Sequence, residues 1–134
     1  MHGGTKENRV FARWGWVMAR VLLLEDNQDI GELLSLMLRQ LDWEVVWVKG
    51  VEEADRVLSR EDDFEAAAFD YQVIGGTSES VVERFTKLYH CPTIAISNDP
   101  LFQEILTQAG CRYSCQKEDL PDFLNGLSGI VTSH

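Results

Sequence analysis

From residue 20 onward, short apolar runs alternate with stretches whose apolar residues recur every three or four positions. The first pattern is typical of a strand buried on both faces, and the second is typical of an amphipathic helix. The five expected strands are residues 20–25, 44–49, 65–70, 93–97 and 111–116. The five expected helices are residues 29–43, 51–60, 78–90, 98–110 and 120–131. Five strand–helix units of this length predict an α/β fold, in which helices cover both faces of a doubly wound parallel sheet.

Capping residues mark several of the expected helix ends. Asn27 or Asp29 can cap the first helix. Asp99, which is followed by a proline, can cap the fourth helix, and Gly110 can end it. Residues 71–77 contain a glycine pair and are expected to form a loop.

The size and charge of the chain narrow the class of protein. Its 134 residues fit one domain, which we place at residues 19–134. The formal net charge is −10, which argues against nucleic acid as a direct partner. The apolar runs are all shorter than the roughly 18 residues of a membrane span, so we expect no membrane association.

Residues 1–18 form an N-terminal extension that we expect to be poorly ordered. Residues 1–17 lack the apolar region and the cleavage site of a signal peptide, so a cytoplasmic location is expected. Residues 1–20 carry a charge balance of +3, which leaves −13 for the rest. The alternative is therefore a basic aromatic arm, bearing Phe11, Trp14 and Trp16, that docks elsewhere.

The three cysteines show neither a CxxC pair nor a recognisable zinc-ligand spacing. Cys111 and Cys115 would lie four residues apart in a strand, too far for a disulfide. We expect these two thiols and Cys91 to be reduced and to pack as small hydrophobic side chains.

Polar side chains gather at the carboxyl ends of the expected strands. Glu25 and Asp26 end the first strand, and Asp70 ends the third. Ser97 ends the fourth strand, and Lys117 follows the fifth. Because ligands of such sheets bind beyond the carboxyl ends of the strands, we expect these five side chains to share one site.

The chemistry of this set favours phosphoryl transfer. Three neighbouring carboxylates repel one another, and Mg²⁺ relieves that repulsion while keeping positions open for substrate oxygens. Lys117 and Ser97 can contact a phosphoryl oxygen, and a carboxylate can act as the nucleophile.

These residues, in this order, resemble the receiver domain of bacterial two-component response regulators. The resemblance covers about residues 19–130. Asp70 lies 44 residues after Asp26, as is typical of the family, and the segment AGCRYSCQK at residues 109–117 is similar to the family's stretch before its lysine. The resemblance implies a flavodoxin-like fold with strand order 2-1-3-4-5.

The resemblance also implies a role for each site residue. Asp70 would be the phosphoacceptor, receiving the phosphoryl group from a phosphohistidine of a sensor histidine kinase or a histidine phosphotransfer protein. Asp26, Asp70 and the backbone carbonyl of Gln72 would ligate Mg²⁺, with Glu25 acting directly or through water. Lys117 would contact the acceptor carboxylate and then the phosphoryl group.

Ser97 would turn inward to bond the phosphoryl oxygen and so shift the following loop. The implied protein is a switch in phosphorelay signal transduction rather than an enzyme. Its downstream effector is not indicated by the sequence.

Several positions depart from the family pattern. Ile74 stands where the family has a proline, and Gly75-Gly76 comes earlier than expected, so we expect a rebuilt loop. Asn98 replaces a small residue and can crowd the phosphoryl group or hydrogen-bond beside it.

The last departures lie around the site lysine. Ser114 occupies the position of the switch aromatic, while Tyr113 is one residue away and is expected to point to the opposite face. Glu118 replaces the proline after Lys117. Because a cis bond there would cost about 3 kcal/mol, we expect the trans form, with a cis bond held by the site as the alternative.

Two other functions are considered. A receiver-like interaction module that signals without phosphorylation would explain the missing aromatic and the larger Asn98, but it has no need of three repelling acids. A flavin or nucleotide binder needs an anion cradle after the first strand, where EDNQDIGEL is acidic instead.

Overall fold

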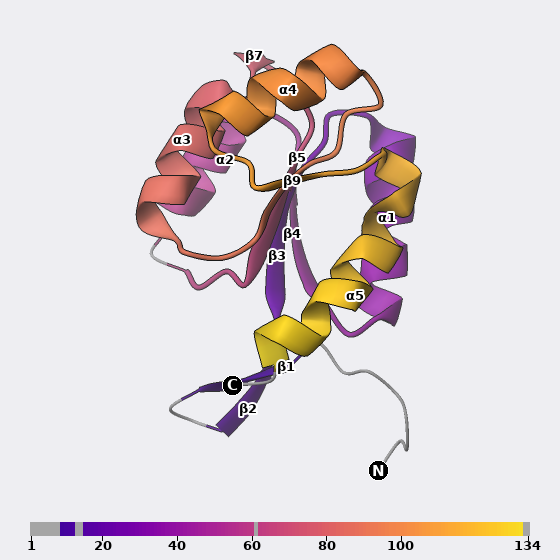
Figure 1. The fold of residues 1–134 in the computed structure, drawn as a ribbon. Helices are drawn as coiled ribbons and strands as arrows, with labels where there is room; N and C mark the ends of the chain where they lie inside the picture. The colour runs from indigo at the N-terminus through magenta and orange to yellow at the C-terminus, as the bar shows by residue number, and fades with distance from the viewer. Residues whose placement is uncertain (1–8, 13–14, 61, 133–134) are drawn as a thin grey trace.

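A five-stranded parallel sheet forms the centre of the computed structural model, which describes residues 9–12, 15–60 and 62–132, with side chains for residues 18–60 and 62–127 (Figure 1). Its strands are β3 (Arg20–Leu24), β4 (Glu44–Val48), β5 (Ala66–Phe69), β8 (Thr93–Ala95) and β9 (Tyr113–Ser114). The order across the sheet is β4-β3-β5-β8-β9, and every pair is parallel. This confirms the predicted flavodoxin-like order 2-1-3-4-5.

Helices cover both faces of the sheet (Figure 1). They are α1 (Gln28–Gln40), α2 (Val51–Leu58), α3 (Glu79–Leu88), α4 (Pro100–Ala109) and α5 (Leu120–Thr132), and a 3-10 turn η1 (Lys117–Asp119) precedes α5. Successive residues of β3 point to opposite faces. Leu23 packs on the side of α1 and α5, whereas Leu22 and Leu24 pack on the side of α2, α3 and α4.

The helix starts follow the predicted caps. The side chain of Asn27 accepts a hydrogen bond from the backbone of Ile30, so Asn27 rather than Asp29 caps α1. Asp99 caps α4 by accepting from Leu101, and Gly110 ends that helix with a φ of 135°. In the part of the chain that the structure describes, no helix is both long and apolar enough to cross a bilayer.

The segment after β5 is a small hairpin rather than an unstructured loop. Strands β6 (Gln72–Val73) and β7 (Gly76–Thr77) pair antiparallel around a turn with positive φ at Gly75 and Gly76. The tip is bonded to the segment after β4, because Ile74 accepts from the Val51 amide at 2.9 Å and donates to the Lys49 carbonyl at 3.1 Å. The rebuilt loop thus has its own backbone hydrogen bonds.

Part of the N-terminal extension lies in regular secondary structure. Strands β1 (Arg9–Ala12) and β2 (Gly15–Met18) form an antiparallel pair that lies beside α5 (Figure 1). Trp14 and residues 1–8 lie outside the described residues.

Candidate functional site

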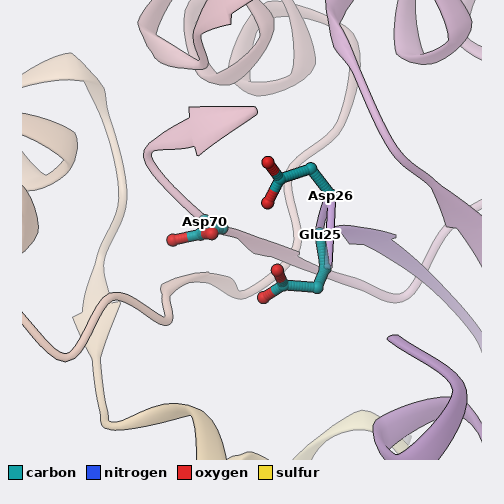
Figure 2. A group of neighbouring side chains, drawn as sticks. All are labelled: Glu25, Asp26 and Asp70. Atoms are coloured by element: carbon teal, nitrogen blue, oxygen red, sulfur yellow. The ribbon is translucent and has the colours of Figure 1, made fainter. Parts of the chain in front are cut away.

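Three carboxylates converge at the carboxyl ends of two central strands. Glu25 and Asp26 follow β3, and Asp70 follows β5. One oxygen of each lies within 4.8 Å of the other two, and Figure 2 shows both β3 carboxylates turned to the side on which Asp70 lies. Glu25 and Asp70 are buried, whereas Asp26 is exposed. Hard divalent cations bind such oxygen ligands.

Glu25 has no exposed surface, which is unusual for a carboxylate. Its Oε1 lies 2.9 Å from Lys117 Nζ, and its Oε2 accepts from the Asn27 amide at 3.1 Å. Burial raises the pKa of this carboxyl above its ordinary value, although the lysine and the amide act in the opposite direction. The ionised form is therefore held by two contacts and strained by desolvation.

Lys117 bridges the two buried acids. Its Nζ lies 3.0 Å from Asp70 Oδ2 as well as 2.9 Å from Glu25 Oε1. Burial alone would lower the pKa of the ammonium, but the two carboxylates raise it above its ordinary value. The other oxygen of Asp70 accepts from the Tyr71 amide at 2.9 Å. With all groups ionised, three carboxylates and one ammonium leave a net negative site that attracts a cation.

Ser97 follows β8 and is buried next to this group. Its hydroxyl accepts a hydrogen bond from the Asp99 amide at 3.1 Å, immediately before α4. The carbonyl of Ser97 accepts from the side chain of Gln103 at 2.6 Å, and the same amide group reaches the Cys115 carbonyl at 3.4 Å. The ends of β8 and β9 are thus joined through α4.

Asn98 contacts the chain that bears the site lysine. Its Oδ1 accepts from the backbone N–H of Lys117 at 2.9 Å. None of the described residues has a cis peptide bond, so the bond between Lys117 and Glu118 is trans, as predicted. Asn98 therefore fixes a turn that lacks a proline, and it lines the site as well.

An open hollow of about 390 Å³ lies over the carboxylates. Its polar lining includes Asp26, Asp70, Gln72, Ser97, Asn98 and Lys117. All the predicted site residues except Glu25 face this hollow, and Glu25 lies beneath it against Lys117. Phe102 adds an apolar wall that the sequence did not indicate. Its ring packs at a tilt of 32° against Tyr71, with 4.5 Å between the ring centroids.

The aromatic residues near β9 lie as the residue offset predicts. The ring of Tyr113 contacts Phe123 of α5 at a centroid distance of 5.4 Å, and Ser114 on the other side of the strand is exposed. The aromatic pair beside the hollow is instead Tyr71 and Phe102. Two further contacts of the site, those of Trp47 and Gln103, also have no local signal in the sequence.

Comparisons with solved structures identify the fold. The receiver domain of a sensor histidine kinase from Pseudomonas aeruginosa, with magnesium in its active site cleft, has a TM-score of 0.74 and 22% identity, covering 87% of this chain and 98% of its own. A CheY-like receiver domain protein from Methanospirillum hungatei gives 0.73 and 16%, covering 86% and 97%. The HemR receiver domain from Leptospira biflexa gives 0.68 and 25%, covering 84% and 94%.

No protein-family model and no curated protein sequence matches the chain. The structural likeness extends over most of the chain and over nearly the whole length of each of these receiver domains. The protein therefore has the fold of CheY-like response regulator receiver domains, which is the fold that the resemblance of its sequence implies.

Proposed function

We propose that this protein is a response regulator receiver domain that accepts a phosphoryl group on Asp70 in the presence of Mg²⁺ and acts as a signalling switch. The observation that carries the proposal is Lys117, whose Nζ bridges Asp70 and Glu25 within the acid cluster. A domain that only docks has no need of an ammonium bonded to two acids beside a third carboxylate. The proposed donor is a phosphohistidine of a sensor histidine kinase or of a histidine phosphotransfer protein.

The oxygens present suit a magnesium ion. Asp26, Asp70 and Glu25 supply the carboxylates of the cluster, and Gln72, which lines the hollow, would add its backbone carbonyl. The ion would supply positive charge beside the transferred phosphoryl group. Two structural neighbours support this assignment: the Pseudomonas domain contains magnesium, and a cyanobacterial phytochrome response regulator with a TM-score of 0.69 is phosphorylated.

The remaining residues would position and stabilise the phosphoryl group. In the transfer, the P–N bond of the phosphohistidine breaks and a P–O bond to Asp70 forms, while the imidazole keeps the electron pair and takes up a proton. Lys117 already donates a hydrogen bond to the carboxylate of Asp70. After the transfer it would donate to the negatively charged phosphoryl oxygens instead. The Ser97 hydroxyl would donate to one of those oxygens after leaving the Asp99 amide.

Intact-mass measurement tests the proposal. The protein is incubated with Mg²⁺ and acetyl phosphate, and the expected result is one added phosphoryl group in the wild type and none in Asp70→Asn. A second sample without Mg²⁺ is expected to remain unmodified.

The contrary result favours the alternative of an interaction module, for which the exposed Ser114 in place of an aromatic is the motive. If the wild type stays unmodified while an ordinary receiver is labelled, and beryllofluoride with Mg²⁺ also fails to bind, phosphorylation is not its function. Labelling that persists in Asp70→Asn would place the acceptor elsewhere.

A further inference from the structure

The indole group of Trp47 is hydrogen-bonded to the backbone of the acid pair Glu25 and Asp26. Trp47 is a residue of β4, and its Nε1 donates a hydrogen bond of 2.8 Å to the backbone carbonyl of Glu25. The ring reaches this carbonyl by lying against α1, where Gly31 makes room for it. A Cβ at Gly31 would come within 2.0 Å of the ring atom Cζ2. The contact therefore depends on two residues that no part of the proposed chemistry uses.

The hydrogen bond from Trp47 lies just beyond the last backbone hydrogen bond between β3 and β4. The paired register of β3 and β4 ends with Leu24 opposite Val48, and the next backbone bond runs from the Glu25 amide to the Val48 carbonyl at 3.0 Å. Beyond that point the Glu25 carbonyl accepts from the indole. A side chain thus does for this peptide group what a neighbouring strand does for those before it.

The position of Asp26 depends on the hydrogen bonds of the neighbouring main chain, because its own side chain accepts none from the described residues. Among the residues whose side chains the structure describes, none donates a hydrogen bond to the Asp26 carboxylate, which is exposed. The bonds on either side of it do hold the main chain: Trp47 holds the carbonyl of Glu25, and the Asn27 amide donates to Glu25 Oε2 at 3.1 Å. These two bonds restrain the main chain on both sides of Asp26, from which its side chain projects.

We propose that Trp47 is a positioning residue of the magnesium site, which orients the peptide between Glu25 and Asp26 so that their carboxylates converge with that of Asp70. This inference rests on the proposed function, because it concerns the affinity of the same acid cluster for Mg²⁺. Partners that orient metal ligands commonly set metal affinity although they never touch the ion. The competing interpretation is that the indole only fills space between α1 and the sheet.

Replacing Trp47 with phenylalanine separates these interpretations, because it keeps a ring and removes the donor. The matched control is Trp43→Phe. Trp43 is fully buried, and its Nε1 has no hydrogen-bond partner among the described residues. The control therefore removes an equal volume from the core without removing a bond at the site.

The measurements are Mg²⁺ binding by titration calorimetry, urea unfolding, and the rate of Asp70 phosphorylation by acetyl phosphate as a function of Mg²⁺ concentration. For Trp47→Phe we expect the Mg²⁺ dissociation constant to rise about tenfold. The phosphorylation rate at saturating Mg²⁺ is expected to stay near that of the wild type. Trp43→Phe is expected to lose stability and to keep wild-type Mg²⁺ affinity.

Equal Mg²⁺ affinity in Trp47→Phe and the wild type would overturn the inference while leaving the proposed function in place. A fall in affinity that Trp43→Phe shares would also overturn it, because the cause would then be general loosening. A wild type that binds no Mg²⁺ would defeat the proposed function and this inference with it. If Trp47→Phe fails to fold, Gly31→Ala gives a second route, since it displaces the intact indole and is expected to weaken Mg²⁺ binding similarly.

Discussion

The side-chain oxygen of Asn98 accepts a hydrogen bond of 2.9 Å from the backbone N–H of Lys117. The loop after β8 and the turn before α5 are therefore joined beside the site, at a position where the receiver pattern that the sequence resembles has a small residue. The same asparagine lines the hollow over Asp70. One side chain thus influences both the placement of the site lysine and the space left for a phosphoryl group.

Two substitutions at Asn98 separate these effects. Asn98→Ala removes the acceptor and is expected to lower the free energy of unfolding by about 1 kcal/mol in urea titrations. Asn98→Asp keeps an acceptor for the Lys117 amide and is expected to lose less stability. It also places a negative charge beside the hollow, so its phosphorylation by acetyl phosphate is expected to be slower than that of Asn98→Ala. The reverse order of phosphorylation rates would show that charge at this position is unimportant.

The buried carboxyl of Glu25 predicts a pH dependence of stability. Its pKa is raised above 4.5 by burial, so the folded state binds this proton more tightly than the unfolded chain does. The stability that the proton contributes is complete below the unfolded pKa and is lost as the pH rises through the folded pKa. Glu25→Gln carries no such proton and escapes this loss.

The stability difference between Glu25→Gln and the wild type is therefore expected to shift in favour of the variant as the pH rises from about 4 through the raised pKa of Glu25. Urea unfolding at several pH values measures it, and Asp29→Asn, an exposed acid of α1, serves as the control. A difference that does not change with pH, or that shifts toward the wild type, would contradict the assigned burial effect. Glu25→Gln is also expected to bind Mg²⁺ more weakly than the wild type, since it removes the charge of one proposed ligand.

Gly50 is expected to tolerate no side chain. A Cβ there would lie 2.5 Å from the carbonyl oxygen of Ile74, where the hairpin after Asp70 is bonded to the segment after β4. Gly50→Ala is therefore expected to cost about 2 kcal/mol of unfolding free energy through steric strain. Gly126→Ala is the matched control: it meets nothing within 4 Å in α5 and is expected to stabilise the protein by about 0.5–1 kcal/mol. Equal effects at both positions would argue against the close approach at Gly50.

The cysteines are expected to react slowly in the folded protein. All three are free thiols, and burial raises the pKa of Cys91 and Cys111 to about 12 and that of Cys115 to about 11. Because the thiolate is the reactive form, alkylation by iodoacetamide at pH 8 is expected to be at least about tenfold slower in the folded protein than in urea. Mass spectrometry of each cysteine peptide measures this. A thiol that reacts equally fast in both states would contradict the raised pKa assigned to it.

The succession of strands and helices and the gathering of acids could be predicted from the sequence pattern, whereas the strand order came from the resemblance to receiver domains. Apolar runs and helical periodicity are local signals, and the connection rules for parallel sheets then bring Glu25, Asp26 and Asp70 to one edge. Lys117 and Ser97 follow by the same argument, since each comes within three residues of the end of a strand of that sheet. Cap residues such as Asn27 and Asp99 were also readable, because they act on amides two or three positions away.

The supporting contacts could not be predicted in this way. The bonds of Trp47 to Glu25 and of Asn98 to Lys117 join residues 22 and 19 positions apart, and each depends on the direction of a single side chain. The packing of Phe102 against Tyr71 likewise requires the placement of α4 over the sheet. The hairpin after Asp70 was hidden for a different reason: its strands have only two residues each, too few for any alternation to be visible.

The bond between Ser97 and the Asp99 amide sets a free-energy cost for the proposed switch, because it must break before the serine can turn. Turning the hydroxyl toward a phosphoryl group removes one neutral hydrogen bond, worth about 1 kcal/mol, and creates a charge-assisted one worth about 1.5–3 kcal/mol. The two orientations are close enough in energy to be reversible. Since Asp99 also caps α4, its released amide would loosen the first turn of that helix. Faster hydrogen exchange at Asp99 in the beryllofluoride complex is the expected sign, and unchanged exchange would mean that the serine does not move.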